Sequence, residues 1–312
     1  MNALIFPGQG SQVIGMGLEF YNKFDVVKKI FNQAGERLNL PLTKIILEGP
    51  EDKLKSTSIT QPAILTVSYS IFKILKNEFN LNLDLFKFFA GHSLGEYSAL
   101  VCSNGLDFND AIYLLHERGN AMQDAVPVGQ GAMLAVLGLE VEKIKKLIYE
   151  CKINGVCDIA NDNADGQVIV SGDSESIKKF QNLLKNNKVK SIPLKVSAPF
   201  HCSLMKPAAI KMTEKIKITN FNQPSTKIVS NVTANSEEDP KKIKSLLIEQ
   251  IFSIVRWRES LIFMSNNGVK NFIEIGPGKA LTGMVKRTLK NVNCFSINSI
   301  NDIEEFNDKF KK

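Results

Sequence analysis

The sequence predicts an α/β fold whose large core is built on a parallel sheet. In three places a short apolar strand runs through a glycine-containing turn into a helical pattern, and these strands are 3–6, 86–90 and 270–275. Repeated strand-turn-helix units of this kind are typical of α/β proteins. Because ligands bind at the carboxyl ends of such strands, we expect the three glycine turns to share one cleft.

The interval 131–196 has a different pattern. Its predicted elements follow the order β-α-β-β-α-β, which is the order of a ferredoxin-like unit. The elements are strand 131–139, helix 141–151, strands near 156–160 and 167–171, a helix from Asp173 to Asn186 and strand 189–196.

The two patterns divide the chain into two subdomains. We predict a large α/β subdomain from residues 1–127 and 197–312, and a small ferredoxin-like subdomain inserted at 128–196. No internal repeat or low-complexity linker interrupts either part of the chain.

The composition is that of a globular protein, with 312 residues, 44% hydrophobic and 23% charged. No apolar run approaches the roughly 18 residues that span a bilayer, and no signal-like segment opens the chain, so we expect a cytoplasmic protein without a membrane partner. The cysteines form no C-x-x-C pair, and His, Asp and Glu show no ligand-like clustering. We therefore expect reduced, mostly buried thiols and no metal.

The formal net charge of +7 favours acidic partners through electrostatic steering. The lysines are scattered through amphipathic segments such as 141–150 and 176–190, and they are not interleaved with aromatic residues. A nucleic-acid surface usually has such interleaving, so we expect no nucleic-acid partner.

A G-x-S-x-G motif spans Gly91 to Gly95, with an apolar strand before it and a helical segment after it. The small glycines let a strand turn sharply into a helix and hold the Ser93 side chain clear of the backbone. At the helix N-terminus, the N–H of Leu94 can meet developing negative charge. Ser93 is therefore our candidate nucleophile, and a plain strand-to-helix turn with a serine cap is the alternative.

A serine nucleophile needs a base, and the chain has 3 histidines. His92 adjoins the serine, so the turn should direct its side chain elsewhere. His116 lies among charged residues on a helix, which favours a surface role. His201 lies in a loop after the inserted unit, where catalytic groups are common, and it is our candidate base. The neighbouring Cys202 is expected to be small buried filler.

Arg118 lies on the helix predicted over 109–124. Apolar residues at three- and four-residue spacing define one face of this helix: Ala111, Leu115 and Met122. Arg118 falls on the same face, so its guanidinium should point inward and need an anion. A salt bridge to a nearby carboxylate, or a buried stem with an exposed charge, is the alternative.

Six separated motifs carry a resemblance that covers nearly the whole chain. In order and spacing they resemble those of the malonyl-CoA:acyl carrier protein transacylases and of the acyltransferase domains of polyketide synthases. The motifs are Phe6-Pro7-Gly8-Gln9-Gly10-Ser11-Gln12, Gly91-His92-Ser93-Leu94-Gly95-Glu96-Tyr97, Glu117-Arg118-Gly119, Phe200-His201, Gln250 with Val255-Arg256-Trp257, and Glu274-Ile275-Gly276-Pro277-Gly278.

The resemblance implies an α/β-hydrolase-like core with the ferredoxin-like insertion. It also implies that Ser93 is the nucleophile and His201 the base, with an oxyanion hole made by the backbone N–H groups of Gln9 and Leu94. Gln250 would orient His201 through its side chain or its backbone, in place of the acid of a catalytic triad.

The resemblance further implies the substrates. Arg118 would bind the free carboxylate of a malonyl group, and Phe200 would narrow the pocket against an α-methyl group. Asn161 and Asn163 would line the cleft, although both residues also suit a turn. The implied reaction is ping-pong transfer of malonyl from malonyl-CoA to the phosphopantetheine thiol of an acidic acyl carrier protein, by a monomer without cofactor, in fatty-acid synthesis.

Three alternatives stay open. An α/β-hydrolase esterase would share the G-x-S-x-G motif but would use water as acceptor and an acid partner for the base. A catalytically dead scaffold would only dock carrier protein. An acyltransferase of polyketide synthesis would differ in its pathway.

Overall fold

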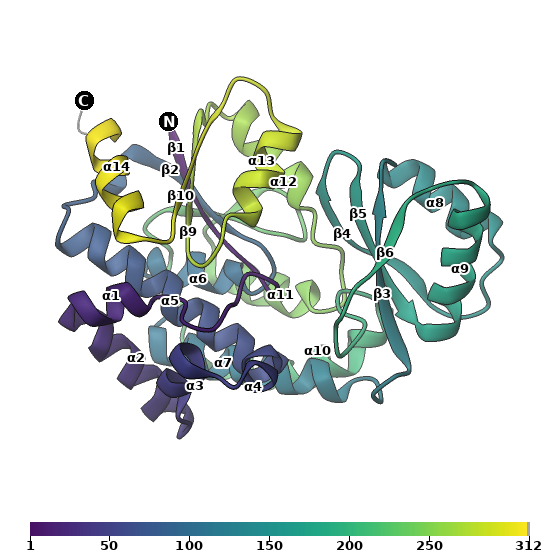
Figure 1. The fold of residues 1–312 in the computed structure, drawn as a ribbon, viewed down its shortest axis with the longest axis horizontal. Helices are drawn as coiled ribbons and strands as arrows, with labels where there is room; N and C mark the ends of the chain where they lie inside the picture. Colours follow the sequence, from purple (N-terminus) through teal and green to yellow (C-terminus); the bar gives the residue numbers. More distant parts are fainter. Residues whose placement is uncertain (311–312) are drawn as a thin grey trace.

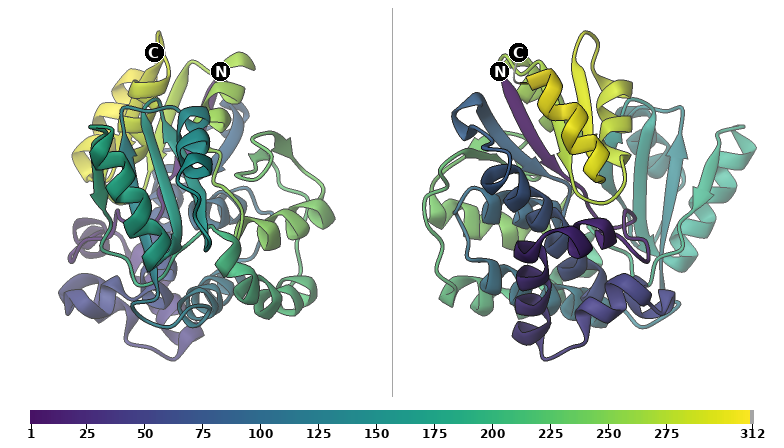
Figure 2. Two further views of the ribbon diagram at one scale, coloured as in Figure 1. Left: turned by 90° about the vertical axis from the view of Figure 1, so that its right-hand side faces the viewer. Right: turned by 60° about the vertical axis from the view of Figure 1, so that its left-hand side comes forward.

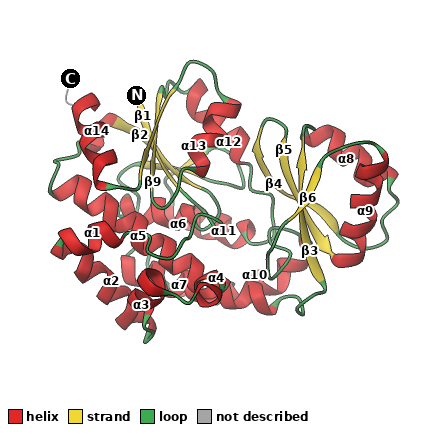
Figure 3. Ribbon diagram, in the orientation of Figure 1, coloured by secondary structure: helices red, strands yellow, loops and turns green. Residues whose placement is uncertain are grey.

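The computed structural model describes residues 1–310, and two separate sheets organise them (Figures 1 and 3). The larger sheet has six strands in the order β10-β9-β1-β2-β7-β8. All neighbours in it are parallel except β7 and β8. The prediction of an α/β fold is confirmed. Its strands are β1 (Asn2–Phe6), β2 (Phe86–Gly91), β7 (Lys227–Val229), β8 (Ser236–Glu237), β9 (Asn271–Ile275) and β10 (Asn293–Ile297).

The central strands have the near-continuous apolar sequences of strands covered on both faces. All five residues of β1 are buried, and so are all residues of β2 except Lys87. In the register of the sheet, Ile5 of β1 lies beside Ala90 of β2 and Glu274 of β9. These strands therefore end at the same edge of the sheet, where the loops that follow them come together.

Helices cover both faces of this sheet (Figure 2). The first half of the chain supplies α1 (Leu18–Lys23), α2 (Asp25–Leu38), α3 (Leu42–Glu48), α4 (Glu51–Lys55), α5 (Thr57–Asn77), η1 (Leu83–Leu85), α6 (Gly95–Cys102) and α7 (Phe108–Asp124). The second half supplies η2 (Ser203–Met205), α10 (Lys206–Ile218), α11 (Pro240–Gln250), α12 (Trp257–Asn266), α13 (Ala280–Thr288) and α14 (Ile300–Phe310).

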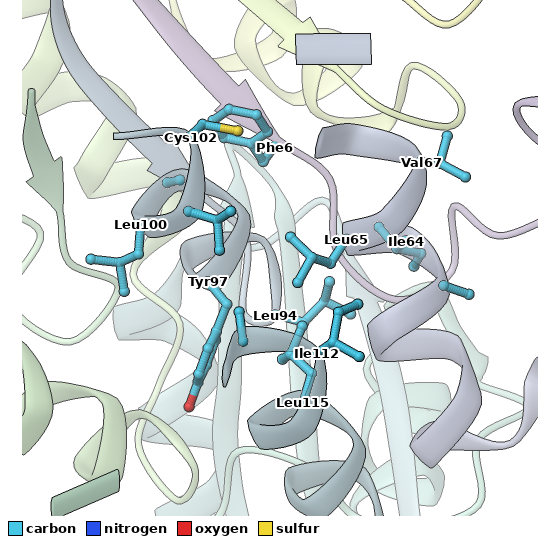
Figure 4. Packing of buried hydrophobic residues seen from close by; sticks show 14 of the residues in the cluster. Phe6, Ile64, Leu65, Val67, Leu94, Tyr97, Leu100, Cys102, Ile112 and Leu115 are labelled. Atoms are coloured by element: carbon cyan, nitrogen blue, oxygen red, sulfur yellow. The ribbon is translucent and has the colours of Figure 1, made fainter. Parts of the chain in front are cut away.

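Helices α5 and α6 lie in the middle of the main hydrophobic core. Both are apolar around most of their circumference, as expected for buried helices. Leu65 of α5, Leu94 and Tyr97 at the start of α6, and Leu115 of α7 meet there beside Phe6 of β1 (Figure 4). This packing fixes the start of α6, and with it the turn that contains Ser93.

The smaller sheet is antiparallel, in the order β4-β5-β3-β6, and α8 and α9 cover one of its faces (Figure 1). It has its own apolar core, which includes Leu134, Val170 and Phe180. Its elements are β3 (Gly131–Leu137), α8 (Val141–Glu150), β4 (Cys157–Ala164), β5 (Gln167–Asp173), α9 (Ser174–Asn186) and β6 (Ser191–Pro193).

The predicted order of these elements is confirmed, but two lengths differ from the prediction. Strand β6 ends at Pro193, where proline lacks the N–H that a ladder uses, and is shorter than the predicted 189–196. Strand β4 is longer than the predicted 156–160 because it continues through Asn161 and Asn163. The reading of these asparagines as turn residues is therefore wrong.

Strand β4 also joins the two sheets. The segment before α12 pairs with it, since Val255 N–H donates to Ala160 O at 2.8 Å and Asp162 N–H donates to Val255 O at 3.0 Å. The Arg258 guanidinium lies 2.9 Å from the Asp162 carboxylate. Within residues 1–310, no helix combines the length and the apolar character that crossing a membrane requires.

Candidate active site

The turn between β2 and α6 presents Ser93 at the carboxyl edge of the large sheet. Ser93 has φ of 52°, in the left-handed region that costs a non-glycine residue about 1–3 kcal/mol. The turn closes because its flanking residues are glycines. A Cβ on Gly91 would lie 1.9 Å from the backbone of Gly95, and one on Gly95 would lie 2.2 Å from Phe6 O. The two glycines therefore allow the sharp strand-to-helix turn that the sequence predicted.

Ser93 and His201 form a hydrogen-bonded pair. Ser93 Oγ lies 2.8 Å from His201 Nε2, and His201 Nδ1 lies 2.8 Å from the carbonyl oxygen of Gln250. A carbonyl oxygen can only accept, so Nδ1 carries the proton and Nε2 is the acceptor. Ser93 Oγ–H therefore donates to Nε2, which is the orientation that a general base requires.

His201 is held in its neutral form. Its side chain is buried, and burial together with the charge of Arg118 lowers the pKa of His201 to about 3. The hydrogen bond to Gln250 O opposes this shift but does not reverse it. At neutral pH the ring is thus free to accept the serine proton.

Gln250 acts on His201 through its backbone, since the carbonyl accepts from the ring. Its side chain has other partners. Gln250 Nε2 donates to Glu96 Oε2 at 2.8 Å and to Ser93 O at 3.1 Å, while Gln250 Oε1 accepts from Arg118 at 3.0 Å. The sequence did not decide whether the side chain or the backbone of Gln250 would orient His201. In the structure the backbone carbonyl contacts His201, and the side chain contacts Glu96, Ser93 and Arg118.

Arg118 of α7 points its guanidinium at the serine. Its Nη2 donates to Ser93 Oγ and to Gln250 Oε1, both at 3.0 Å, and its Nη1 donates to Gln61 Oε1 at 2.7 Å. The side chain is 1% exposed, which confirms the predicted inward direction. All three acceptors are neutral, and burial lowers the pKa of Arg118. A buried guanidinium that is paired only with neutral groups has the charge and the donor geometry to bind an anionic group.

Two backbone amides next to Ser93 are unpaired. The N–H of Leu94 at the start of α6 and the N–H of Gln9 in the loop after β1 have no hydrogen-bond partner among residues 1–310. The neighbouring amide of Ser93 is engaged, because it donates to Asn231 Oδ1 at 2.7 Å. The unpaired pair could donate to an oxyanion formed at the serine.

A cavity of about 460 Å³ opens onto Ser93. Seven of the predicted residues line it, whereas Gln250 and Leu94 are not among its lining residues. The seven are Gln9, Ser93, Arg118, Asn161, Asn163, Phe200 and His201. A larger groove of about 1080 Å³ touches the far side of His201 but reaches neither Ser93 nor Arg118.

The other histidines and Cys202 lie outside the hydrogen-bonded pair of Ser93 and His201. His92 Nε2 lies 2.8 Å from Asn163 Oδ1, and the ring packs edge-on against Trp257, so the turn does direct it away from the serine. His116 is half-buried and its Nδ1 lies 2.9 Å from Ser58 O, so it is more enclosed than the surface role expected for it implies. Cys202 is buried, and burial raises its pKa to about 11.

The sequence interpretation missed three buried polar residues that belong to the hydrogen-bond network of Ser93 and Arg118: Gln61, Glu96 and Asn231. Asn231 Oδ1 accepts from Ser93 N, and its Nδ2 donates to Gly91 O at 2.7 Å. Burial raises the pKa of Glu96 to about 7, against the opposing effects of its Asn231 and Gln250 hydrogen bonds. A usable signal existed for Asn231, because it follows the apolar strand β7 at its carboxyl end.

Comparison with known proteins gives one answer. Residues 3–306 match the acyl transferase domain family. The chain is 41% identical over 304 residues to the malonyl CoA-acyl carrier protein transacylase of Bacillus subtilis, covering 97% of this chain and 95% of the relative. The Haemophilus influenzae protein of the same name is 39% identical, covering 97% and 98%.

The chain belongs to the malonyl CoA-acyl carrier protein transacylase family of acyltransferases.

Solved transacylase structures match it over the full length. The acyl-carrier-protein-S-malonyltransferase of Bartonella henselae superposes with a TM-score of 0.96 at 38% identity, covering 100% of this chain and 99% of that one. A malonyl-transacylase in complex with its type II PKS acyl-carrier protein superposes with a TM-score of 0.95 at 36% identity, covering 99% of each chain.

Proposed function

We propose that this acyltransferase moves a malonyl group from malonyl-CoA to the phosphopantetheine thiol of acyl carrier protein, through a malonyl ester on Ser93. One observation carries the proposal. The buried Arg118 guanidinium lies 3.0 Å from the nucleophile oxygen and is paired only with neutral acceptors. A malonyl carboxylate would supply the missing negative charge.

In the first half-reaction, Ser93 Oγ attacks the thioester carbon while its proton passes to His201 Nε2. The carbonyl oxygen becomes an oxyanion, which the amides of Gln9 and Leu94 stabilise. The C–S bond then breaks, and the CoA sulfur takes the proton from His201. The second half-reaction runs in reverse, with the carrier thiol as attacking group and Ser93 as leaving group.

The remaining site residues shape the acyl pocket in this proposal. Gln250 O orients the His201 ring, and Phe200 limits the space beside the α-carbon. Asn161 and Asn163 line the same cavity from β4, and Asn163 also fixes His92. The chemistry needs no metal or redox cofactor, because His201 and the two amides handle the proton and the developing charge.

For the architecture we propose an α/β-hydrolase-like core from residues 1–127 and 197–312, with a ferredoxin-like subdomain inserted at 128–196. The parallel sheet and the serine turn between β2 and α6 support the first assignment. The order β4-β5-β3-β6 with two helices on one face supports the second.

We further propose that the enzyme works as a cytoplasmic monomer in fatty-acid synthesis, with no membrane or nucleic-acid partner. The net charge of +7 suits steering of an acidic acyl carrier protein. Polyketide synthesis is the second candidate, since a solved relative is a malonyl-transacylase bound to a type II PKS acyl-carrier protein.

Intact-mass measurement tests the proposal directly. The protein is exposed to malonyl-, acetyl- and methylmalonyl-CoA, and holo acyl carrier proteins of both pathway types are then added. We expect a malonyl adduct that is stable in water. The fatty-acid carrier protein should accept the malonyl group from it faster than the polyketide carrier protein does. Rapid loss of the adduct to water would indicate an esterase, and no adduct would indicate a docking scaffold. Preferential transfer to the polyketide carrier would reverse the pathway assignment.

A further inference from the structure

Glu96 is a buried carboxylate that the proposed reaction does not use. It lies in the first turn of α6, three residues after the nucleophile, and is 2% exposed. One of its oxygens, Oε2, accepts both of its hydrogen bonds: from Asn231 N at 3.0 Å and from Gln250 Nε2 at 2.8 Å. Both donors are neutral amides. Burying an ionisable carboxyl against neutral donors is costly.

One of these hydrogen bonds leads to the nucleophile. Asn231, held by Glu96 through its backbone N–H, grips both sides of the serine turn. Its Oδ1 accepts from Ser93 N at 2.7 Å, and its Nδ2 donates to Gly91 O at 2.7 Å. Ser93 is in the left-handed region, so a support of this kind is needed to keep its Oγ in place.

The other hydrogen bond leads to the arginine. A carboxylate can only accept, so the Gln250 amide must turn its NH₂ group toward Glu96. Its oxygen then faces Arg118, from which it accepts at 3.0 Å. With the opposite orientation, the amide NH₂ would face the guanidinium, which has no acceptor. The Glu96 carboxylate, together with the Ser93 carbonyl oxygen that accepts from the same NH₂ group at 3.1 Å, thereby selects the orientation of Gln250 that directs Arg118 toward Ser93.

In its ionised form, Glu96 also brings negative charge close to Arg118. The guanidinium is buried, and its direct acceptors are Gln61, Gln250 and Ser93, all neutral. The Glu96 carboxyl lies beyond the Gln250 amide, so one side chain separates the two charged groups. Before substrate binds, this is the carboxylate that opposes the buried positive charge.

We propose that Glu96 is a positioning residue for carboxylate-bearing acyl groups: through Gln250 it aims Arg118 at the acyl group, and through Asn231 it holds the Ser93 turn. The inference rests on the proposed malonyl transfer. It separates two effects, because the Asn231 contact serves every acyl group, whereas the Gln250 contact serves only those with a free carboxylate.

The test is the variant Glu96→Gln, alone and combined with Arg118→Ala. Gln has nearly the same shape and keeps an acceptor, but it has no charge and its amide could also donate to Gln250, which weakens the preference for the present Gln250 orientation. The readout is kcat/KM for loading malonyl-CoA and acetyl-CoA on one preparation. Because both substrates meet the same protein, the malonyl-to-acetyl ratio does not depend on the fraction that folds.

We expect Glu96→Gln to lower the malonyl-to-acetyl ratio by about tenfold, which is the size of coupling usual for residues in one network. In the Arg118→Ala background the same change should alter the ratio by less than about threefold, since the arginine it acts through is gone. An unchanged ratio in the first case, or an equal drop in both backgrounds, would overturn the inference.

Glu274→Gln provides the matched control. Glu274 is equally buried, and it caps the start of α13 by accepting from Leu281 N at 3.1 Å and Thr282 N at 2.7 Å. We expect this variant to lower the melting temperature and to leave the malonyl-to-acetyl ratio at the wild-type value. A fall in the ratio equal to that of Glu96→Gln would mean that any buried carboxylate has this effect, and the inference would fail. A wild-type protein that does not load malonyl would overturn the proposed function first.

Discussion

In the large sheet the strands that carry the site run in one direction, whereas in the small sheet neighbouring strands alternate. Gln9, Ser93 and Asn231 each follow the carboxyl end of a different parallel strand, and so they meet at one edge. The small sheet contributes the pleated face of β4 instead. Asn161 and Asn163 are two residues apart on that strand, so they point the same way, into the cavity.

The edge of the large sheet and the face of the small sheet therefore have different roles in the site. Groups at the parallel edge are fixed to each other by hydrogen bonds of 2.7–3.0 Å that tie the turn, the base and the arginine together. Side chains on the pleated face form a wall with fewer such ties, among them the hydrogen bond of Asn163 to His92. We therefore expect large losses from substitutions at the edge and small losses from substitutions on the face.

The largest effect is expected for Ser93→Ala, which removes the attacking oxygen. No acyl adduct should form with any acyl-CoA, while the fold should persist because the side chain is small. Intact mass after exposure to malonyl-CoA measures this outcome. A malonyl adduct that persists on the variant would show that the nucleophile lies elsewhere.

His201→Ala should lower turnover by about 10²–10⁴, the usual contribution of a positioned general base. Steady-state transfer to holo acyl carrier protein is the measurement, with a thermal melt to check folding. A loss below about fivefold would mean that another group accepts the serine proton.

The pH profile examines the same residue. The pKa of His201 is lowered to about 3, so the neutral base is present at neutral pH and persists as the pH falls. The kcat/KM for loading acetyl-CoA should thus stay near its neutral value down to about pH 5. An acid limb centred near the ordinary histidine pKa of about 6.5 would contradict this.

Arg118→Ala should lower malonyl loading by about thirtyfold to several thousandfold, because losing one partner of a buried charge pair costs roughly 2–5 kcal/mol. Acetyl loading should change little or rise, since no carboxylate is left unpaired. Arg118→Lys should recover little of the malonyl loading that Arg118→Ala loses, because an ammonium cannot form two parallel hydrogen bonds with a carboxylate. Equal losses for both acyl groups would make Arg118 a structural residue.

The wall of the cavity, which includes the pleated face of β4 and the loop residue Phe200, should give the smallest effects. Phe200 should disfavour methylmalonyl-CoA by about 1–3 kcal/mol, so Phe200→Ala should narrow the preference for malonyl. Asn163→Ala, which loses one neutral hydrogen bond to His92, should cost about twofold to tenfold in malonyl loading. If methylmalonyl-CoA loads on the wild type as fast as malonyl-CoA, or if Asn163→Ala matches His201→Ala, the division between edge and face is wrong.

Local patterns in the sequence predicted the parts of the site that local chemistry determines. The serine turn follows from the two glycines, and the inward direction of Arg118 follows from helical spacing. The network of Glu96 and Asn231 was missed because it joins α6 to the loop after β7, and the two residues are 135 positions apart in the sequence. Only the packing of distant strands brings those groups together, and no short pattern encodes it.

The close approach of Gly91 and Gly95 has a practical consequence for redesign. A side chain at either glycine would meet backbone atoms at 1.9–2.2 Å, and backbone cannot move aside as a flexible side chain can. Mutant libraries aimed at new acyl groups should therefore leave this turn constant and vary the wall at Phe200, Asn161 and Asn163. Substitutions at these three positions should admit new acyl groups while the turn that carries Ser93 keeps its geometry.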